Sequence, residues 1–436
     1  MEPHKRIESL LDVLGIERMH VGCSNLGELE PLLAETPGRI ASVTMVNPNR
    51  LSPQRLTDLG DRLTIVTGTS GLPASVVSGA QAALAGASIH RLPDYETAAW
   101  SDMVADAPAL VRDAVCAHIA DSDVPDASIR AGTAAASGEV EGIRYSITGS
   151  GPPLLLLPLL LSPSQWGPIV AALAERFTVI QLGGAHLGMI AMLESRGGEA
   201  GYTRAVRAVF DVIAPHEGEQ ILEIGCGSGV LVRWLAQHTG GRNPIVATDL
   251  NPFFLDEAQA LSDNAGLGET IEFGEANAEA LPFEDASVDI AFSSTVMEEC
   301  DAEKMLAEMI RVTRPGGRVG VIVRATDAHS VCGVEVEPDI RAIIETPYRS
   351  VSAGGIADAS LFGRFAASGL VDCQFFPHFL TLTDPDGAAW AYREPFFLGQ
   401  FSPEQTERWV RARQAAAAQG TFVFASGLHC AVGTKP

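Results

Sequence analysis

The chain has 436 residues, of which 46% are hydrophobic and 19% are charged, and its formal net charge is −24 at pH 7. A chain of this size and composition can bury large cores and has room for two or three domains. The acidic balance argues against nucleic acid and anionic membrane surfaces as partners, because both are bound through basic patches.

The N-terminal segment is amphipathic and lacks the apolar centre of a signal peptide. The most apolar run, residues 152–161, contains three prolines and is far too short to span a bilayer. The seven cysteines are scattered along the chain and form no CxxC pair, which is a poor match to a zinc site or a disulfide framework. We therefore expect a cytoplasmic protein that binds no metal and does not enter the membrane.

Apolar strand-like runs alternate with helical segments in three stretches, which is the pattern of an α/β fold. A weak linker rich in Asp, Ala, Gly and Ser, residues 121–138, follows the first stretch. The third stretch runs from about residue 202 to the end. In the first two stretches we expect strands at residues 19–23, 41–47, 63–68, 87–92, 154–157 and 178–182, and a helix near residues 107–119.

The most informative motif is residues 221–229 (ILEIGCGSG), where an apolar run ends in a glycine-rich loop before a helical segment. Glycines allow a sharp turn and a close ligand, and the following helix begins with unpaired N–H groups. The next strand-like run ends in Asp249, a position from which a carboxylate can accept the protons of both ribose hydroxyls. The third glycine comes one residue earlier than in a dinucleotide fingerprint, and Glu223 suits a cationic amino-acid tail better than a pyrophosphate.

This loop resembles motif I of class I S-adenosylmethionine-dependent methyltransferases, and the resemblance continues in register over about residues 205–325. Residues 277–283 (NAEALPF) are similar to the adenine-side loop, and residues 288–294 (VDIAFSS) to the fourth strand. Residues 305–319 match the helix, turn and fifth strand. A glycine-rich loop alone can be merely a tight turn, but four ordered motifs favour the methyltransferase.

The resemblance implies that S-adenosylmethionine is the cofactor, and the residues that it places around this cofactor lie mostly at strand ends. It places Gly225, Gly227 and Gly229 along the methionine part, Glu223 at its ammonium, Asp249 at the ribose, Leu250 and Ala278 beside adenine, Asn277 (where an Asp is usual) at the exocyclic amine, Ser293 beneath the sulfonium and Tyr202 as a cap. No residue of this set is expected to bind a metal.

The acceptor side is less defined by the sequence. Related small-molecule methyltransferases usually carry a Glu-His pair after the fourth strand, and here Glu299 replaces the His. Glu299 either binds a cationic acceptor or acts as a base, or it is a solvated residue at a helix entry. Insertions near residues 325–358, which contain His329 as a further catalytic candidate, and near 377–420 are expected to build the acceptor pocket. The aromatic cluster of the second insertion predicts either an apolar cavity or ordinary core.

The first 190 residues resemble an α/β-hydrolase in inverted order. Residues 14–27 are similar to the strand and nucleophile elbow with Ser24, whereas residues 143–186 are similar to the opening of that fold. This order predicts a circular permutation. Leu26 occupies the second glycine position of the elbow, and residues 94–97 (DYET) provide no His where the triad His belongs. We therefore expect a catalytically degenerate domain.

The expected fold is α/β in two domains: a permuted hydrolase-like domain over residues 1–195 and a Rossmann-like, seven-stranded methyltransferase domain over residues 196–436. The predicted function is methyl transfer from S-adenosylmethionine to a small-molecule metabolite by in-line displacement, with a homodimer formed through the first domain. Two alternatives stay open. One is a bifunctional enzyme whose first domain still cleaves or cyclises a substrate through Ser24, and the other is a non-catalytic regulatory module that keeps the cofactor pocket.

Overall fold

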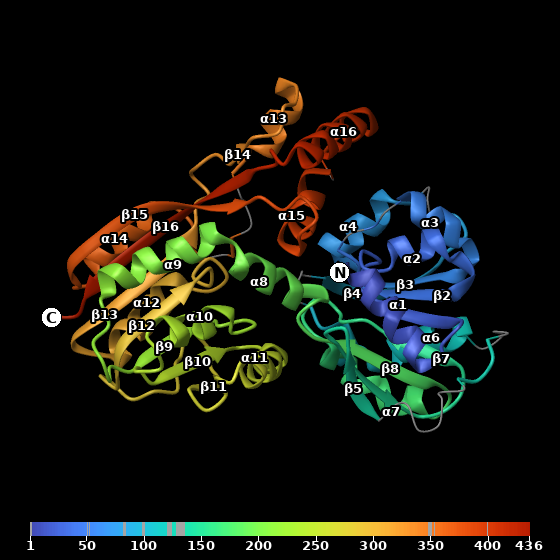
Figure 1. The fold of residues 1–436 in the computed structure, drawn as a ribbon, viewed down its shortest axis with the longest axis horizontal. Coiled ribbons are helices and arrows are strands. Elements are labelled where there is room, and N and C mark those ends of the chain that lie inside the picture. Colours follow the sequence, from blue (N-terminus) through green and yellow to red (C-terminus); the bar gives the residue numbers. More distant parts are fainter. Residues whose placement is uncertain are drawn as a thin grey trace. The chain divides into compact units, whose positions relative to one another are not determined.

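The computed structural model describes residues 2–49, 51, 53–81, 84–97, 101–119, 124–127, 136–347, 351–352, 354–398 and 400–436. The chain divides into two compact units, Met1–Ala191 and Met192–Pro436, and helix α8 (Gly188–Gly198) contains the boundary. Each unit is built around a sheet of its own (Figure 1). The linker expected at residues 121–138 lies largely outside the described residues.

The sheet of the first unit has eight strands in the order β4–β3–β2–β1–β7–β8–β6–β5. Neighbours run parallel from β4 to β8, whereas β6 is antiparallel to both β8 and β5. The six strands expected here are confirmed, although β3 and β4 extend further than expected. The strands are β1 (Met19–Cys23), β2 (Ile40–Val46), β3 (Leu63–Gly71), β4 (Ser88–Thr97), β5 (Ser137–Val140), β6 (Ile143–Thr148), β7 (Pro153–Leu156) and β8 (Thr178–Gly183).

Helices cover both faces of this sheet, because its central strands are apolar on both sides. One core lies under α1 (Pro3–Leu14), α2 (Glu30–Glu35), α3 (Pro53–Leu59) and α4 (Leu72–Gly79). The other lies under α5 (Met103–Asp106), α6 (Pro108–Ile119), which is the expected closing helix, and α7 (Gly167–Ala174). Short 3-10 turns precede β2, β3 and α7: η1 (Pro37–Arg39), η2 (Gly60–Arg62) and η3 (Pro163–Trp166).

The sheet of the second unit has the order β11–β10–β9–β12–β13–β16–β14, with β15 paired to the other side of β16. The first five strands are parallel, and β16 is antiparallel to β13 and β15. The sheet has eight strands rather than the expected seven, because a two-residue strand, β14, joins its edge. The strands are β9 (Ile221–Ile224), β10 (Ile245–Asp249), β11 (Ile271–Glu275), β12 (Val288–Ser294), β13 (Thr313–Arg324), β14 (Val331–Cys332), β15 (Val371–Leu382) and β16 (Phe424–Thr434).

Two helical layers enclose this second sheet (Figure 1). One layer contains α9 (Ala200–Ile213), α10 (Val230–His238) and α11 (Pro252–Asn264), and the other contains α12 (Ala302–Val312) and α14 (Ser360–Ala367). Helix α12 begins at Asp301, whose carboxylate accepts from the Lys304 amide, and Lys435 donates to the carbonyls at its other end.

Strands β15 and β16 continue beyond the end of β13 and carry a small cap (Figure 1). The residues of β16 before Leu428 no longer pair with β13 but still pair with β15, and at Phe424 and Ala425 they also pair with β14. Around this ribbon lie α13 (Pro338–Ile344), α15 (Ala388–Leu398) and α16 (Pro403–Gln419), which share a separate hydrophobic core.

The longest described helix, α16, has 17 residues and carries charged side chains along its length. No helix in the described part of the chain is long and apolar enough to cross a membrane. The same residues include no group of three or more His, Cys, Asp or Glu side chains that could hold a metal ion.

Candidate functional site

The second sheet has a topological switch point beside β9. The chain winds outward from β9 through β10 and β11, and then places β12 on the opposite side of β9. In open parallel sheets, ligands bind outside the carboxyl ends of the strands at such a point. The glycine loop after β9, Asp249 at the end of β10 and Ser293 near the end of β12 all come from this edge.

The glycine loop adopts a backbone that residues with a Cβ rarely take. Gly225, Gly227 and Gly229 have φ values of 75°, 55° and 72°. An added Cβ on Gly225 would also collide with the Val296 side chain. The amide of Gly225 donates to the Thr248 carbonyl oxygen at 2.7 Å, and so does the next amide, at 2.8 Å, which holds the loop against the end of β10.

Two carboxylates lie beside this loop. Glu223 on β9 is 2% exposed, and no described residue donates a hydrogen bond to its carboxylate. Burial, and then the charge of Asp249, raise the pKa of Glu223 to about 8. Burial also raises the pKa of Asp249, although its oxygens accept from the amides of Asn251 and Gly227 at 3.0 and 2.8 Å.

A buried carboxylate without a partner is costly, and a cationic group would relieve that cost. The ammonium of S-adenosylmethionine is such a group, and Asp249 has two oxygens at the strand end where ribose hydroxyls would donate. The residues present at this edge therefore fit the cofactor that the sequence implies.

The residues expected beside adenine flank the same edge. Leu250 follows Asp249 directly and is 63% exposed, so its apolar side chain is accessible for contact with a flat ring. Ala278 is buried, whereas Asn277 is exposed. The Asn277 Oδ1 accepts from the Glu279 amide at 2.9 Å and keeps a second lone pair for a donor such as an amine.

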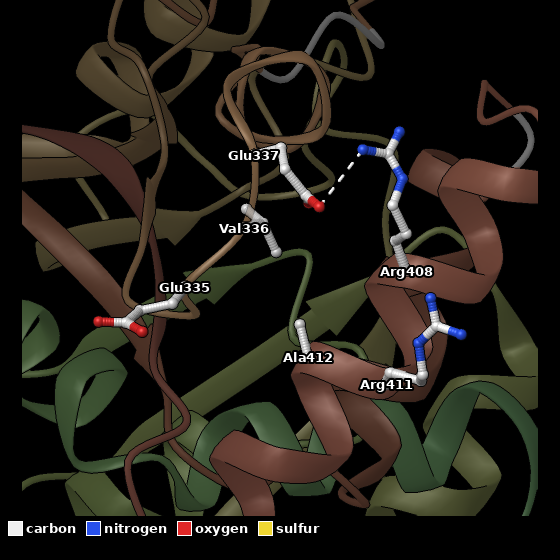
Figure 2. A pocket seen from close by; sticks show the side chains of 6 residues that line it. All are labelled: Glu335, Val336, Glu337, Arg408, Arg411 and Ala412. Atoms are coloured by element: carbon white, nitrogen blue, oxygen red, sulfur yellow. Dashed lines mark ion pairs between the residues drawn. The ribbon is translucent and has the colours of Figure 1, made fainter.

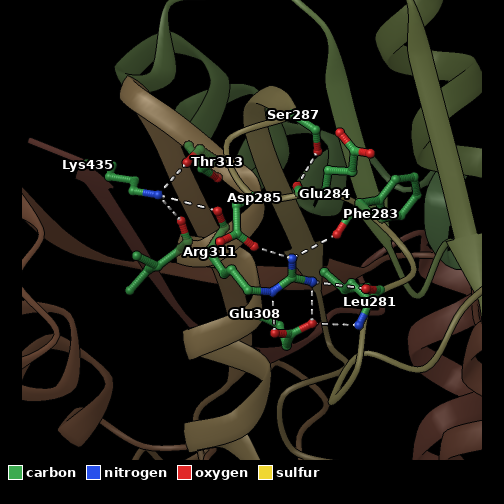
Figure 3. Close-up of polar contacts among 10 residues, drawn as sticks. Leu281, Phe283, Glu284, Asp285, Ser287, Glu308, Arg311, Thr313 and Lys435 are labelled. Atoms are coloured by element: carbon green, nitrogen blue, oxygen red, sulfur yellow. Dashed lines mark hydrogen bonds and ion pairs between the residues drawn. The ribbon is translucent and has the colours of Figure 1, made fainter.

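The loop that follows Asn277 and Ala278 is held by Arg311, a residue that the sequence analysis did not identify (Figure 3). From α12, the Arg311 guanidinium donates to the carbonyls of Leu281 and Phe283 at 3.0 and 2.8 Å and pairs with Asp285 and Glu308. Glu308 in turn accepts from the Leu281 amide at 2.7 Å. One side chain thus holds residues 281–285 of the loop, just after Ala278.

Two expected cofactor residues belong to the core in this structure. The Ser293 hydroxyl donates to the Ile224 carbonyl at 2.8 Å, and Ser293 is 1% exposed. Tyr202 is fully buried, its hydroxyl is 2.8 Å from the Ser294 hydroxyl, and the Arg196 guanidinium lies over its ring. The Tyr202 ring therefore belongs to the core of the ligand-free structure, and its expected role as a cap of the cofactor stays a prediction.

The two candidate catalytic residues are both engaged elsewhere. Glu299 and the fully buried Glu298 share Arg324, with Arg324 Nη2 2.5 Å from Glu299 Oε1 and Arg324 Nε 3.0 Å from Glu298 Oε1. The Nδ1 of His329 is 3.1 Å from the Glu345 carbonyl, on the outside of the unit. Each side chain thus has a structural partner in the ligand-free structure, and its catalytic role stays a prediction.

The aromatic cluster of the second insertion is core rather than a cavity. Trp390, Trp409 and Phe397 are at most 2% exposed and pack together under the cap helices. Beside this core a groove of about 400 Å³ separates α16 from the segment before α13 (Figure 2). Its lining is mainly charged and includes the ion pair between Arg408 and Glu337, so it is no apolar substrate pocket.

The serine of the first unit does not form a nucleophile elbow. Ser24 follows β1, is 4% exposed and lacks the positive φ of a strained strand-to-helix turn. The described partner of its hydroxyl is the Asn25 side chain, at 3.5 Å, rather than a histidine. The fully buried Trp166 packs against Gly22 and donates to the Leu157 carbonyl at 2.7 Å.

Known proteins match the second unit in part. The chain is similar to the ubiquinone/menaquinone biosynthesis C-methyltransferases UbiE of Francisella tularensis and Hahella chejuensis, with 35% identity over 108 and 117 residues. These matches cover 24% and 27% of this chain and 43% and 47% of the relatives, so the chain spans less than half of their length. The solved structure of YcgJ from Bacillus subtilis is 16% identical and covers 53% of this chain and 98% of its own, with a TM-score of 0.37.

A family match delimits the domain. Residues 222–321 match the family described as a methyltransferase domain, and this range begins in β9 and ends in β13. It includes the glycine loop, Asp249 and the adenine-side loop. The chain therefore carries a class I S-adenosylmethionine-dependent methyltransferase domain, and the prediction of S-adenosylmethionine as its cofactor is confirmed.

Proposed function

We propose that the protein transfers a methyl group from S-adenosylmethionine to a small-molecule acceptor. The observation that carries this proposal is the buried, unpartnered Glu223 beside Asp249 at the switch point of the second sheet. An acidic pair at the edge of a glycine loop is adapted to a cationic nucleoside. The same pair would repel the phosphates of a dinucleotide.

The residues of the chain would hold the cofactor in a fixed pose. Glu223 would pair with the ammonium, Asp249 would accept from the ribose hydroxyls, and Leu250 would cover the adenine. When bound, S-adenosylmethionine supplies a methyl group on a cationic sulfur that an acceptor atom displaces in line. The task of the surrounding residues is then alignment and exclusion of water.

The proposed transfer uses no general base. The two carboxylates after β12, Glu298 and Glu299, are both bonded to Arg324, so we infer that this group stabilises the loop after β13. An acceptor that carries no removable proton, or one that is already ionised, needs no base. The net charge of −24 favours an apolar or weakly cationic metabolite over a nucleic acid.

We propose further that the first unit is a circularly permuted, inactive α/β-hydrolase-like domain. The permutation can be undone by renumbering β5 to β8 as strands 1 to 4 and β1 to β4 as strands 5 to 8. The strands then lie in the order 1-2-4-3-5-6-7-8, and strand 2 is antiparallel to its neighbours. This is the sheet arrangement that the sequence resemblance implies. The buried Ser24 without an elbow favours a scaffold, with a homodimer through this unit as its expected use, over a second active site.

Calorimetry with S-adenosylmethionine tests the cofactor site. We expect Asp249→Ala to abolish measurable binding. The control is Asp289→Ala, which removes another largely buried carboxylate. Asp289 accepts from the Gln220 backbone amide at 2.8 Å and pairs with Arg314. Near-native affinity in Asp249→Ala would refute the site.

Labelled cofactor and a pool of metabolites test the transfer itself. We expect one methylated small molecule to form with the wild-type protein and none with Asp249→Ala. The product would identify both the acceptor and the methylated atom. Cofactor binding without transfer to any pool would instead favour a non-catalytic regulatory module.

A further inference from the structure

The glycine loop has a second carboxylate partner that lies outside the expected motifs. Glu194, on α8, accepts from the Ser228 hydroxyl at 2.5 Å through Oε1. Its other oxygen, Oε2, is 2.5 Å from Nη2 of Arg233, which lies in the first turns of α10. Arg233 also donates to the Ser228 carbonyl at 2.7 Å, so the three residues form a closed ring of contacts.

This ring is well enclosed. Ser228 is fully buried, and the side chains of Arg233 and Glu194 are 11% and 20% exposed. Charge-assisted hydrogen bonds in such surroundings are stronger than those on an open surface, because water competes less for the partners. The contacts of Glu194 are therefore more than a solvent-exposed ion pair.

The same end of α8 packs against the loop. A Cβ added to Gly227 would lie 3.0 Å from Cδ1 of Leu193, one residue before Glu194. Gly197, one turn further, faces Val230 so closely that an added Cβ would collide with both of its methyl groups. Helix α8 thus packs against the glycine loop and the start of α10. It does so through close contacts at Gly227 and Gly197 and through the ring of contacts among Glu194, Ser228 and Arg233.

Two carboxylates hold adjacent residues of the loop from two different elements. Asp249, from β10, accepts from the Gly227 amide, and Glu194, from α8, accepts from the Ser228 hydroxyl. Asp249 is also the residue assigned to the ribose hydroxyls, so its oxygens are shared between loop and ligand. Glu194 has no such second task in the site. It therefore remains the fixed support of the loop.

We propose that Glu194 is a positioning residue for cofactor binding: through Ser228 and Arg233 it keeps the glycine loop in the left-handed shape that the cofactor needs. This inference rests on the proposed function. It also gives Arg233 a defined role, since Glu194 holds the guanidinium that donates to the Ser228 carbonyl.

The test measures the affinity for S-adenosylmethionine and the melting temperature of the full chain. Glu194→Gln keeps an acceptor for Ser228 but removes the charge, and we expect Kd to rise about tenfold, a loss of about 1.4 kcal/mol. The matched control is Glu219→Gln, which breaks the ion pair between Glu219 and Arg318. This pair has the same N–O distance, 2.5 Å, and similar side-chain exposure, but it lies before the start of β9 rather than after its end. The control should lower the melting temperature as much and leave Kd unchanged.

A double-mutant cycle separates positioning from general stability. If Glu194 acts through the Ser228 hydroxyl, then Glu194→Gln and Ser228→Ala together should raise Kd by less than the product of their single effects. Equal Kd values for Glu194→Gln and the wild type would overturn the inference, as would an equal rise in Glu219→Gln. Absence of binding by the wild type would instead refute the proposed function.

Discussion

The two units place comparable loops after comparable strands, and only the loop of the second has left-handed glycines among the described residues. In both, a parallel strand buried in the middle of a sheet ends in a short turn, at residues 24–29 after β1 and 225–229 after β9. The second turn has three left-handed glycines and follows the buried carboxylate of Glu223 on β9. The first has ordinary backbone, a buried serine and a tryptophan packed against the preceding glycine.

The difference shows that the sheet alone does not decide function. Both units have helices on two faces and an open carboxyl edge, yet only the edge of the second has a buried carboxylate beside a loop of left-handed glycines among the described residues. The comparison can be tested by changing matched residues in the two loops.

The largest expected difference comes from alanine at the corresponding glycines. Gly225→Ala forces a Cβ into a left-handed position and against Val296, at a cost of about 2–4 kcal/mol. We expect cofactor binding to fall below detection, because the loop must move. Calorimetry and thermal unfolding report the two effects separately.

The partner change in the first unit is Gly22→Ala. Here φ is ordinary, but the added Cβ would lie 2.7 Å from Leu156 and 3.1 Å from Trp166. We expect a stability loss of about 1–3 kcal/mol with unchanged Kd for S-adenosylmethionine. A change in Kd as large as that of Gly225→Ala would show that the first unit takes part in cofactor binding.

A smaller effect is expected from the support of the adenine-side loop. Arg311→Met removes the donors to two loop carbonyls and should cost about 2 kcal/mol and weaken cofactor binding several-fold. The control Arg411→Met breaks an exposed pair with Glu407 and should cost less than about 0.5 kcal/mol. Equal effects would mean that the Arg311 contacts add nothing beyond a surface ion pair.

Much of the second unit follows from its sequence because the motifs are local. A few consecutive residues are enough to identify the glycines at 225, 227 and 229, the acidic end of β10 and the apolar strands. The strands of the first unit are equally readable, since buried parallel strands are continuous apolar runs. The ends of β3 and β4 cannot be predicted in this way, because each strand is extended by its pairing with the other.

The contacts that support the site join residues far apart in sequence. Glu194 meets Ser228 across 34 residues, and Arg311 meets the Leu281 carbonyl across 30. Nothing in the sequence around Arg311 or Glu194 distinguishes it from a solvated charge. Tyr202 illustrates the same point, because a tyrosine ahead of a domain suits a lid or a core equally until its hydroxyl partner is known.

The raised pKa of Glu223 predicts that stability and cofactor affinity depend on pH. Its pKa of about 8 in the ligand-free protein exceeds its ordinary value of 4.5, so the folded state binds the extra proton between these values. Stability should therefore fall as pH rises from about 4.5 to 8. An ammonium favours the ionised form, so cofactor binding should release a proton below pH 8, and affinity should rise with pH by up to about tenfold per unit.

Calorimetry in two buffers of different ionisation enthalpy measures this proton release. In Glu223→Gln the release should disappear and affinity should be weaker and flatter with pH. A pH-independent affinity in the wild type would mean that Glu223 is already ionised before the ligand arrives.

The smallest expected effect is at Ser24, where the predicted outcome is no reaction. A fluorophosphonate needs an exposed hydroxyl with a base beside it, but Ser24 is 4% exposed and its described partner is the Asn25 amide. The wild type should therefore stay unlabelled, and Ser24→Ala should leave both Kd and product formation unchanged. Labelling of the wild type that is lost in Ser24→Ala would restore the bifunctional alternative. It would also show that a loop without left-handed strain can still carry a nucleophile, which the contrast with the glycine loop argues against.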